Sequence, residues 1–150
     1  MGYNFILARM RAPQASHPVR IPGETSAAVL PLDDMAPLHD ALRRAIPMAP
    51  QALDIHADAS VTWHTPDGGT LDLLPSALAI NIDTHAGWDH VATLFELMRE
   101  VWPETALMDF QTGHLHDPAS FRAFVDRTRR QPPGHFVRES AARDPGDAGG

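Results

Sequence analysis

The first third of the chain contains a short apolar run, a loop and a stretch with apolar residues at helical spacing. The apolar run Tyr3–Met10 predicts a buried strand. Prolines and glycine recur through residues 11–24, which indicates a loop. Apolar side chains at a helical spacing then predict a helix over Met35–Ile46, with Asp33 or Asp34 as its N-cap.

Three extended runs follow in the middle of the chain. Apolar and polar residues alternate in Ser60–Thr65, and the turn sequence Pro66-Asp67-Gly68-Gly69 comes directly after them. This pattern predicts a hairpin whose return strand is Leu71–Leu74. Pro75 interrupts the return strand, which indicates a bulge or a sheet edge. The alternation in Leu78–Asp83 predicts a half-buried strand with a polar outer face.

The last third predicts two helices around one more strand. The first helix begins at Asp83 or Thr84 and ends before Pro103. A single apolar stripe along it comprises Trp88, Val91, Leu94, Phe95, Met98, Val101 and Trp102. Ala106–Phe110 is expected to be a core strand, and Asp117 is expected to cap the final helix.

The order of these elements predicts a single α+β domain over residues 1–126. Strand, helix, hairpin, helix and strand match the ferredoxin-like split β-α-β-β-α-β arrangement, in which two helices cover one face of an antiparallel sheet. The other face would be solvated, covered by extra segments or offered to a partner. A three-layer α/β fold is the alternative. Residues 127–150 are rich in proline, glycine and arginine and are expected to form a flexible tail.

Composition and charge exclude cysteine chemistry and argue against nucleic-acid binding. The 150 residues include neither cysteine nor lysine, so a disulfide, a zinc–thiolate site or a thiol nucleophile is excluded. Residues 1–126 hold sixteen acids against seven arginines, a net of −9, whereas residues 127–150 hold five arginines against three acids, a net of +2. The acidic body argues against nucleic-acid binding and suits a basic protein partner, although solubility alone also explains it.

The chain carries no recognisable targeting or catalytic motif. The first residues lack a basic region before their apolar run and a cleavage site after it, and no apolar run is long enough to span a bilayer. We therefore expect a cytoplasmic protein. G-x-S-x-G, a P-loop and G-x-G-x-x-G are all absent from the sequence, so an enzyme is not favoured.

Histidines and aspartates gather near two predicted turns. His114 and His116 alternate on one face of a strand, and a second group lies at the corner between strand and helix: Asp83, His85, Asp89 and His90. If the two corners meet, their histidines and aspartates could bind a metal. H-E-x-x-H is absent, however, and no carboxylate lies at helical spacing from a histidine pair. We therefore expect no bound metal and no cofactor.

Asp109 interrupts an apolar strand just before a turn that contains glycine. One interpretation is a carboxylate that acts in catalysis or binds a partner. The other, which we favour, is that it accepts hydrogen bonds from the turn Gln111-Thr112-Gly113.

The candidate site is a polar corner at which carboxylates and imidazoles would be exposed to a basic partner. Its expected partner-binding residues are Asp83, His85, Asp89, Asp109, His114 and His116. Such a surface would attract arginine and lysine and speed association.

One stretch resembles a segment of small bacterial α/β proteins, several of which are immunity proteins encoded beside polymorphic or contact-dependent toxins. It begins at Trp102-Pro103 and continues through Leu107-Met108-Asp109-Phe110-Gln111-Thr112-Gly113-His114-Leu115-His116-Asp117-Pro118. Those proteins have a proline where this chain has Phe110. The resemblance covers about a quarter of the chain, and it implies a non-enzymatic protein that occludes the active site of a toxin. A small His/Asp-based enzyme, a metal-binding protein and a structural subunit are the alternatives.

Overall fold

The computed structural model describes residues 3–12, 16–46 and 52–130. Its strands are β1 Tyr3–Arg9, β2 Val19–Arg20, β3 Leu53–Ile55, β4 Val61–His64, β5 Thr70–Pro75, β6 Ile80–Thr84, β7 Thr105–Asp109 and β8 His114–His116. Its helices are α1 Thr25–Ala28, α2 Ala36–Ala45, α3 Trp88–Val101 and α4 Pro118–Arg130.

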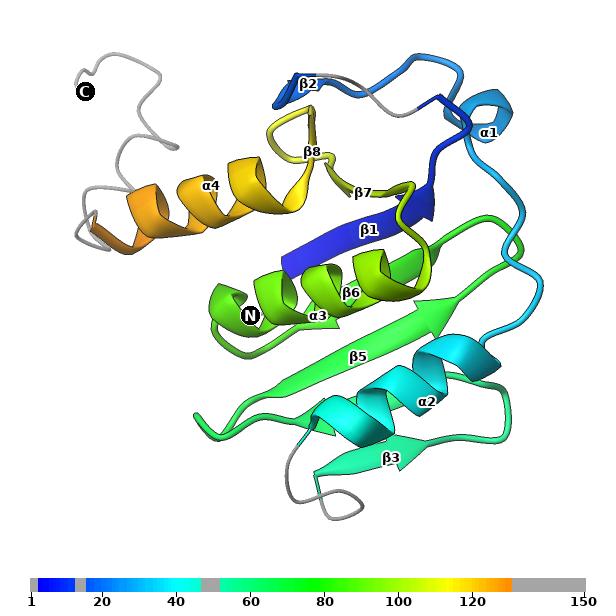
Figure 1. The fold of residues 1–150 in the computed structure, drawn as a ribbon. Helices are drawn as coiled ribbons and strands as arrows, with labels where there is room; N and C mark the ends of the chain where they lie inside the picture. Colours follow the sequence, from blue (N-terminus) through cyan, green and yellow to red (C-terminus); the bar gives the residue numbers. More distant parts are fainter. Residues whose placement is uncertain (1–2, 13–15, 47–51, 131–150) are drawn as a thin grey trace.

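All eight strands form one antiparallel sheet in the order β2-β8-β7-β1-β6-β5-β4-β3 (Figure 1). The prediction that the first strand and Ala106–Phe110 lie in one sheet is confirmed, because β1 and β7 are neighbours with Ile6 opposite Met108. The predicted hairpin is confirmed as β4 and β5, with Val61 opposite Leu73. The fold is therefore mixed α+β and not the three-layer α/β alternative.

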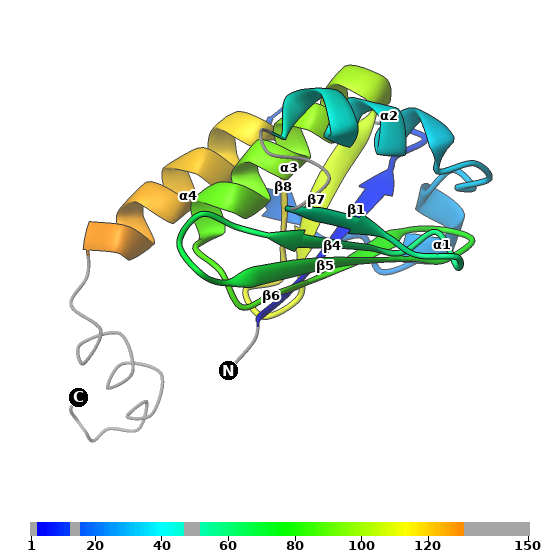
Figure 2. The same ribbon diagram turned by 90° about the horizontal axis from the view of Figure 1, so that it is seen from below.

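The three long helices pack on one face of this sheet. Figure 2 shows α2, α3 and α4 together above the strands. Helix α3 lies between the other two and contacts both. The expected placement of the first and second predicted helices on the same face is thus confirmed, and α4 extends this layer.

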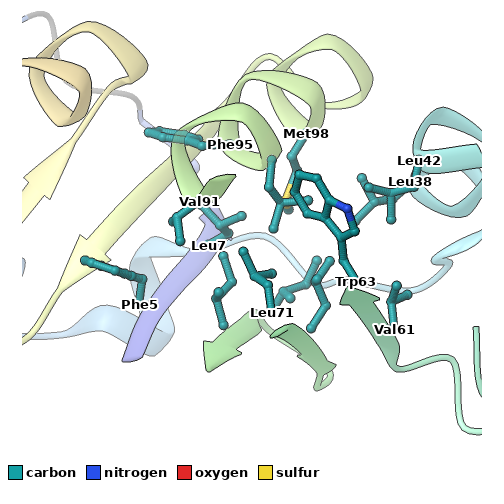
Figure 3. Close-up of a cluster of buried hydrophobic side chains, with 14 of the residues drawn as sticks. Phe5, Leu7, Leu38, Leu42, Val61, Trp63, Leu71, Val91, Phe95 and Met98 are labelled. Carbon is teal, nitrogen blue, oxygen red and sulfur yellow. The ribbon is translucent and has the colours of Figure 1, made fainter. Parts of the chain in front are cut away.

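The core lies between the helices and the inner face of the sheet. Every second side chain along the central strands points toward the helices. Figure 3 shows these side chains beside the apolar side chains of α2 and α3. Trp63 of β4 points toward the two helices between Leu42 and Met98. The fully buried residues with the largest side chains include Phe5, Phe95 and Phe121. Burial of these apolar surfaces is the main favourable term that holds helices and sheet together.

Several boundaries differ from the sequence-based expectation. Strand β3 was not expected, because its three residues are too few to show an alternation. Helix α3 begins after Gly87 rather than at Asp83 or Thr84, since β6 continues through Thr84 to pair with β1 and β5. Helix α4 reaches Arg130, four residues beyond the expected domain boundary. The rest of the expected tail, residues 131–150, lies outside the described residues.

The opposite face of the sheet is divided into a covered and an open part. Over β1, β7 and β8 a second apolar cluster forms, in which Val19, Ile21 and Val29 from the connection between β1 and α2 pack on the sheet. Over β6, β5, β4 and β3 the outward side chains include Asp54, which is exposed. We call the outward side of the whole sheet, opposite α2, α3 and α4, the helix-free face.

The alternation along β5 gives a direct test of this architecture. Leu73 is fully buried under the helices, whereas its neighbour Leu74 is 46% exposed on the helix-free face. We expect Leu73→Ala to lower the free energy of unfolding by about 2–5 kcal/mol, because it opens a cavity in the core. We expect the matched control Leu74→Ala to change it by less than about 1 kcal/mol. Urea unfolding of both variants measures the difference, and equal losses would contradict the assigned register.

Candidate functional site

Polar side chains form a row across five strands of the helix-free face. Asn4 on β1 lies opposite Asp83 on β6, and Asp83 lies opposite Asp72 on β5. The row continues from Asp72 to Thr62 on β4 and from Thr62 to Asp54 on β3. Residues in direct register on an antiparallel sheet point to the same side, so these five side chains share one surface. We call this set the acidic row.

Asp72 and Asp83 face each other directly across β5 and β6. Like charges in this arrangement destabilise a sheet, since their Cβ atoms lie about 5 Å apart. Their nearest polar partners are uncharged or only weakly basic groups. The Thr62 hydroxyl donates to Asp72 at 2.7 Å, and His85 Nε2 lies 3.8 Å from Asp83. At the end of the row, His64 Nε2 lies 3.1 Å from Asp54.

Arginine pairing distinguishes this face from the helical side of the molecule. On that side Arg129 pairs with Asp89 at 2.5 Å and Arg122 pairs with Glu96 at 2.9 Å. Among the residues that the structure describes, no arginine forms an ion pair with an aspartate of the acidic row. The three aspartates of the acidic row, Asp54, Asp72 and Asp83, therefore keep a negative charge that no arginine compensates in this part of the chain.

Exposed apolar side chains gather on the same face. Within the described residues, the exposed large hydrophobic side chains are Leu74, Leu78 and Phe110, at 46%, 39% and 56%. Leu78 and Phe110 border a groove whose floor includes Ile6 and Met108. An exposed apolar patch beside charged groups is a common feature of protein interaction surfaces.

The polar corner expected from the sequence does not form one surface. The expectation that Asp109 is exposed is wrong, because the side chain is fully buried. Its carboxylate accepts hydrogen bonds from the Tyr3 hydroxyl at 3.1 and 3.2 Å and from the Gln111 backbone N–H at 3.0 Å. The favoured interpretation, that Asp109 accepts a hydrogen bond from its own turn, is confirmed.

His116 is also buried, at 2% exposure, so its expected place on the surface is wrong as well. Its ring lies between β8 and α4, 5.7 Å from the rings of both Phe121 and Phe124. Nδ1 hydrogen-bonds the Ser120 hydroxyl at 2.9 Å, whereas Nε2 is buried without a hydrogen-bond partner. Burial lowers the pKa of His116 to about 4, although the carboxylate of Asp109 acts in the opposite direction.

The other four predicted residues lie in three separate places. His114 is half-buried on β8, opposite Asp109. Asp89 lies in the first turn of α3 and pairs with arginines of α4, so its charge is compensated. Asp83 and His85 remain accessible, with side chains 39% and 49% exposed, and lie at one end of the helix-free face. Of the six residues, only Asp83 belongs to the acidic row, and only His85 lies beside it.

The turn between β4 and β5 carries Asp67, which the sequence predicts as a turn residue but not as a contact of α3. Asp67 Oδ2 accepts the backbone N–H of Gly87, the N-cap of α3, at 2.9 Å, and lies 3.5 Å from His90 Nε2. The Thr65 hydroxyl also donates to this carboxylate, and these hydrogen bonds lower the pKa of Asp67 to about 2. Asp67 therefore fixes the hairpin to the start of α3. The same turn also packs closely on the residues before α3, because a Cβ at Gly69 would lie 2.4 Å from the His85 carbonyl oxygen.

Asp54 and Asp72 were also missed, for different reasons. The alternation in Leu71–Leu74 places Asp72 on the outer face, so the sequence did contain a signal for it. Asp54 lies on β3, which the pattern did not predict, and only its pairing with β4 brings it beside Thr62.

Two hydroxyl–imidazole contacts form in the described part of the chain: Thr62 Oγ1 lies 3.0 Å from His56 Nε2, and Ser120 Oγ lies 2.9 Å from His116 Nδ1. The Ser120 contact has the arrangement of a helix cap. Ser120 Oγ accepts the Asp117 N–H at 3.2 Å and donates to the Asp117 carbonyl oxygen at 3.2 Å. The Ser120 N–H donates to Asp117 Oδ1 at 2.8 Å, which confirms Asp117 as the cap of α4. The burial of His116 leaves this pair without access for a substrate.

Among the described residues, no group of three or more histidine, aspartate or glutamate side chains is arranged to hold a metal ion. The expectation of a protein without bound metal stays a prediction. In the same part of the chain, no helix combines the length and apolar character needed to cross a bilayer.

Comparison with known proteins adds no family assignment. No protein-family model matches the chain, and no curated protein matches it significantly. The class of the protein is therefore defined by its fold, an antiparallel α+β sheet with one helical layer and one face without long helices.

The buried imidazole predicts a specific pH dependence of stability. The pKa of His116 is lowered from 6.5 to about 4 in the folded protein, so the unfolded chain binds the proton first as the pH falls. Stability due to the neutral ring is present above pH 6.5, declines between pH 6.5 and about 4, and is lost below, by up to about 3 kcal/mol. Positive charge on His17, His114 and Arg127 also lowers the pKa of His116 and therefore contributes to the same pH dependence.

Urea unfolding of the wild type and His116→Leu across this pH range measures the effect. We expect the variant to lose less stability on acidification than the wild type, because it has no imidazole to protonate. His56→Leu, at an exposed position, is the control for the removal of a histidine. Parallel pH profiles for the wild type and His116→Leu would show that His116 does not carry the effect.

Proposed function

We propose that this chain is a non-enzymatic protein-binding domain that receives a basic partner on its helix-free face. The observation that carries the proposal is the acidic row, without arginine partners among the described residues, beside the domain's exposed apolar side chains. A charged row steers a partner of opposite charge, and desolvated apolar contacts then hold it.

Charge favours a protein over a nucleic acid as this partner. Residues 1–126 carry a net of −9, and the acids of the helix-free face lack arginine partners in the described part of the chain. Phosphate backbones are repelled by such a surface, whereas arginine and lysine side chains are attracted to it. The exposed Leu74 and Phe110 supply apolar area that a nucleic-acid backbone would not use.

Within this class we propose an immunity-type inhibitor that occludes the active site of a cognate bacterial toxin in the cytoplasm. The resemblance of residues 102–118 to immunity-type proteins supports it. A row of carboxylates imitates the negative charge of a nucleic-acid backbone, which suits a toxin whose active site is basic. The resembling segment itself forms β7, its turn and β8, so its contribution is structural, and the proposed contacts come from the helix-free face.

The proposal includes a finer assignment of the fold. The inner strands β7-β1-β6-β5, with α2 and α3 on one face, support a ferredoxin-like split β-α-β-β-α-β unit. On this assignment β4 and β3 extend the unit on one side, whereas β8 and β2 extend it on the other.

The burial of His116 and Asp109 weighs against the alternative of a His/Asp-based enzyme. These residues were its strongest candidates, and both serve internal contacts near the start of α4 and the β7–β8 turn. A substrate would have to open the domain to reach either side chain, which the packing of Phe121 on His116 opposes.

The test compares two variants with the same change of net charge. Asp72→Asn/Asp83→Asn removes two of the three carboxylates of the acidic row. Asp33→Asn/Asp40→Asn removes two exposed carboxylates elsewhere, one before α2 and one within it. The probe is the product of the gene adjacent to the gene for this chain. We expect the first variant to slow association with it by roughly tenfold at low salt and to flatten the salt dependence. The second variant should change the rate much less.

Stopped-flow association and a growth-protection assay with the co-expressed toxin give the readouts. The row variant should fold at least as stably as the wild type, because it removes a repulsion between opposed carboxylates. Urea unfolding measures the stability of the row variant. If the variant is at least as stable as the wild type, a loss of binding is not due to unfolding. Equal effects of the two variants, or no binding of the adjacent product, would refute the proposal.

A further inference from the structure

The groove on the helix-free face has a defined shape and chemistry. Ile6 and Ala8 of β1 and Met108 of β7 form its floor, and Val29, Leu78 and Phe110 lie around it. Its volume is about 190 Å³. An apolar cavity of about 150 Å³ in another protein holds a benzene molecule, so this groove has room for one aromatic or large aliphatic side chain.

The rim of the groove is apolar and exposed to water in the isolated chain. Leu78 and Phe110 are 39% and 56% exposed, whereas the floor residues Ala8 and Met108 are buried. A side chain that entered the groove would cover both rim residues and gain the free energy of apolar burial. Such a central pocket filled by one anchor is the usual arrangement of an interaction hot spot.

The acidic row lies immediately beside this groove. Ile6 on the floor is directly opposite Asn81, and Asp83 is two residues further along the same strand. Ile6 and Asp83 are therefore diagonal neighbours, about 7–8 Å apart. Asp72 lies opposite Asp83 on β5, one strand further from the groove, so Asp83 is the nearer of these two carboxylates.

This charge decides between a second copy of the chain and a basic partner. In a symmetric dimer built on this patch, the acidic rows of both copies would lie within one interface. Like charges brought together in an interface cost several kcal/mol. A partner that carries arginine or lysine next to its apolar anchor satisfies both the pocket and the carboxylates.

We propose that the groove is an anchor pocket for one bulky apolar side chain of the basic partner, with an arginine or lysine of the same segment bound to Asp72 and Asp83. This inference rests on the proposed function and specifies the recognised element. Ile6 in the groove and Asp83 in the row are about 7–8 Å apart. This distance is close to that between two partner side chains two residues apart on a strand, about 6.6 Å, or one turn apart on a helix.

The first experiment uses defined peptides and the full chain labelled with nitrogen-15. The probe is the acetylated and amidated pentapeptide Arg-Ser-Trp-Ser-Arg, and the controls replace its tryptophan by alanine or both arginines by glutamate. We expect the probe at millimolar concentration to shift the amide signals of Ile6, Ala79 and Met108. Each control should bind roughly tenfold more weakly. The absence of shifts, shifts elsewhere, or equal binding of the alanine control would overturn the proposal.

The second experiment fills the groove. Ala79→Phe places a ring among the groove residues, whereas Ala77→Phe adds the same ring to the same loop at an exposed position outside the lining. We expect Ala79→Phe to abolish the peptide shifts and to weaken the adjacent-gene partner by roughly tenfold or more with an unchanged salt slope. Ala77→Phe should leave both unchanged. Urea unfolding of the two variants establishes that both are folded.

The outcomes separate this inference from the proposed function. If the partner binds through the acidic row but Ala79→Phe has no effect, the anchor pocket is wrong and the protein-binding function stands. If the probe binds in the groove but the adjacent product does not bind, the immunity function is wrong and the pocket stands. Concentration-dependent dimerisation of the chain, measured by light scattering and abolished by Ala79→Phe, would assign the groove to a second copy and overturn the proposal.

Discussion

The strict two-residue alternation of the central strands is the constraint on which the rest of this structure depends. In β5 and β6 the apolar side chains of Leu71, Leu73, Ile80 and Ile82 are buried under the helices, and the residues between them face away. A slip of one residue in either strand would place Asp72 or Asp83 in the core and expel Leu73 or Ile82. Burial of these apolar side chains therefore also fixes the carboxylates in their common row.

The distribution of arginine follows from the same division into two faces. Arginines of α4 pair with acids of α3, so these ion pairs link neighbouring helices at the surface. Such exposed pairs contribute little to stability individually, but they cancel the charge of the acids that they contact. The helix-free face has no helix of comparable length to supply arginines, and its aspartates keep their charge in the described structure. The compensation of Asp89 and Glu96 by arginine thus depends on the packing of α4 beside α3.

The polar groups near β7, β8 and α4 show how the same residue types can serve the interior. Asp109 joins the first strand to the last turn through Tyr3 and Gln111. His116 joins β8 to the first turn of α4 through Ser120 and leaves Nε2 without a partner. A buried polar atom without a hydrogen bond costs about 1–3 kcal/mol, which the aromatic packing around the ring offsets. These contacts stabilise the docking of α4 and leave the surface chemistry to other residues.

The sequence by itself determined the elements with long or strongly patterned signals. These are the first strand, the hairpin, the stripes of α2 and α3, and the cap at Asp117, because local spacing and turn chemistry specify each of them. Only the tertiary structure decided which polar residues reach the surface. Asp109 and His116 resemble exposed turn residues in the sequence, and packing of Tyr3 and α4 buries them. The acidic row joins β1, β6, β5, β4 and β3, whose residues lie far apart in the chain, so strand register, a non-local property, sets their proximity.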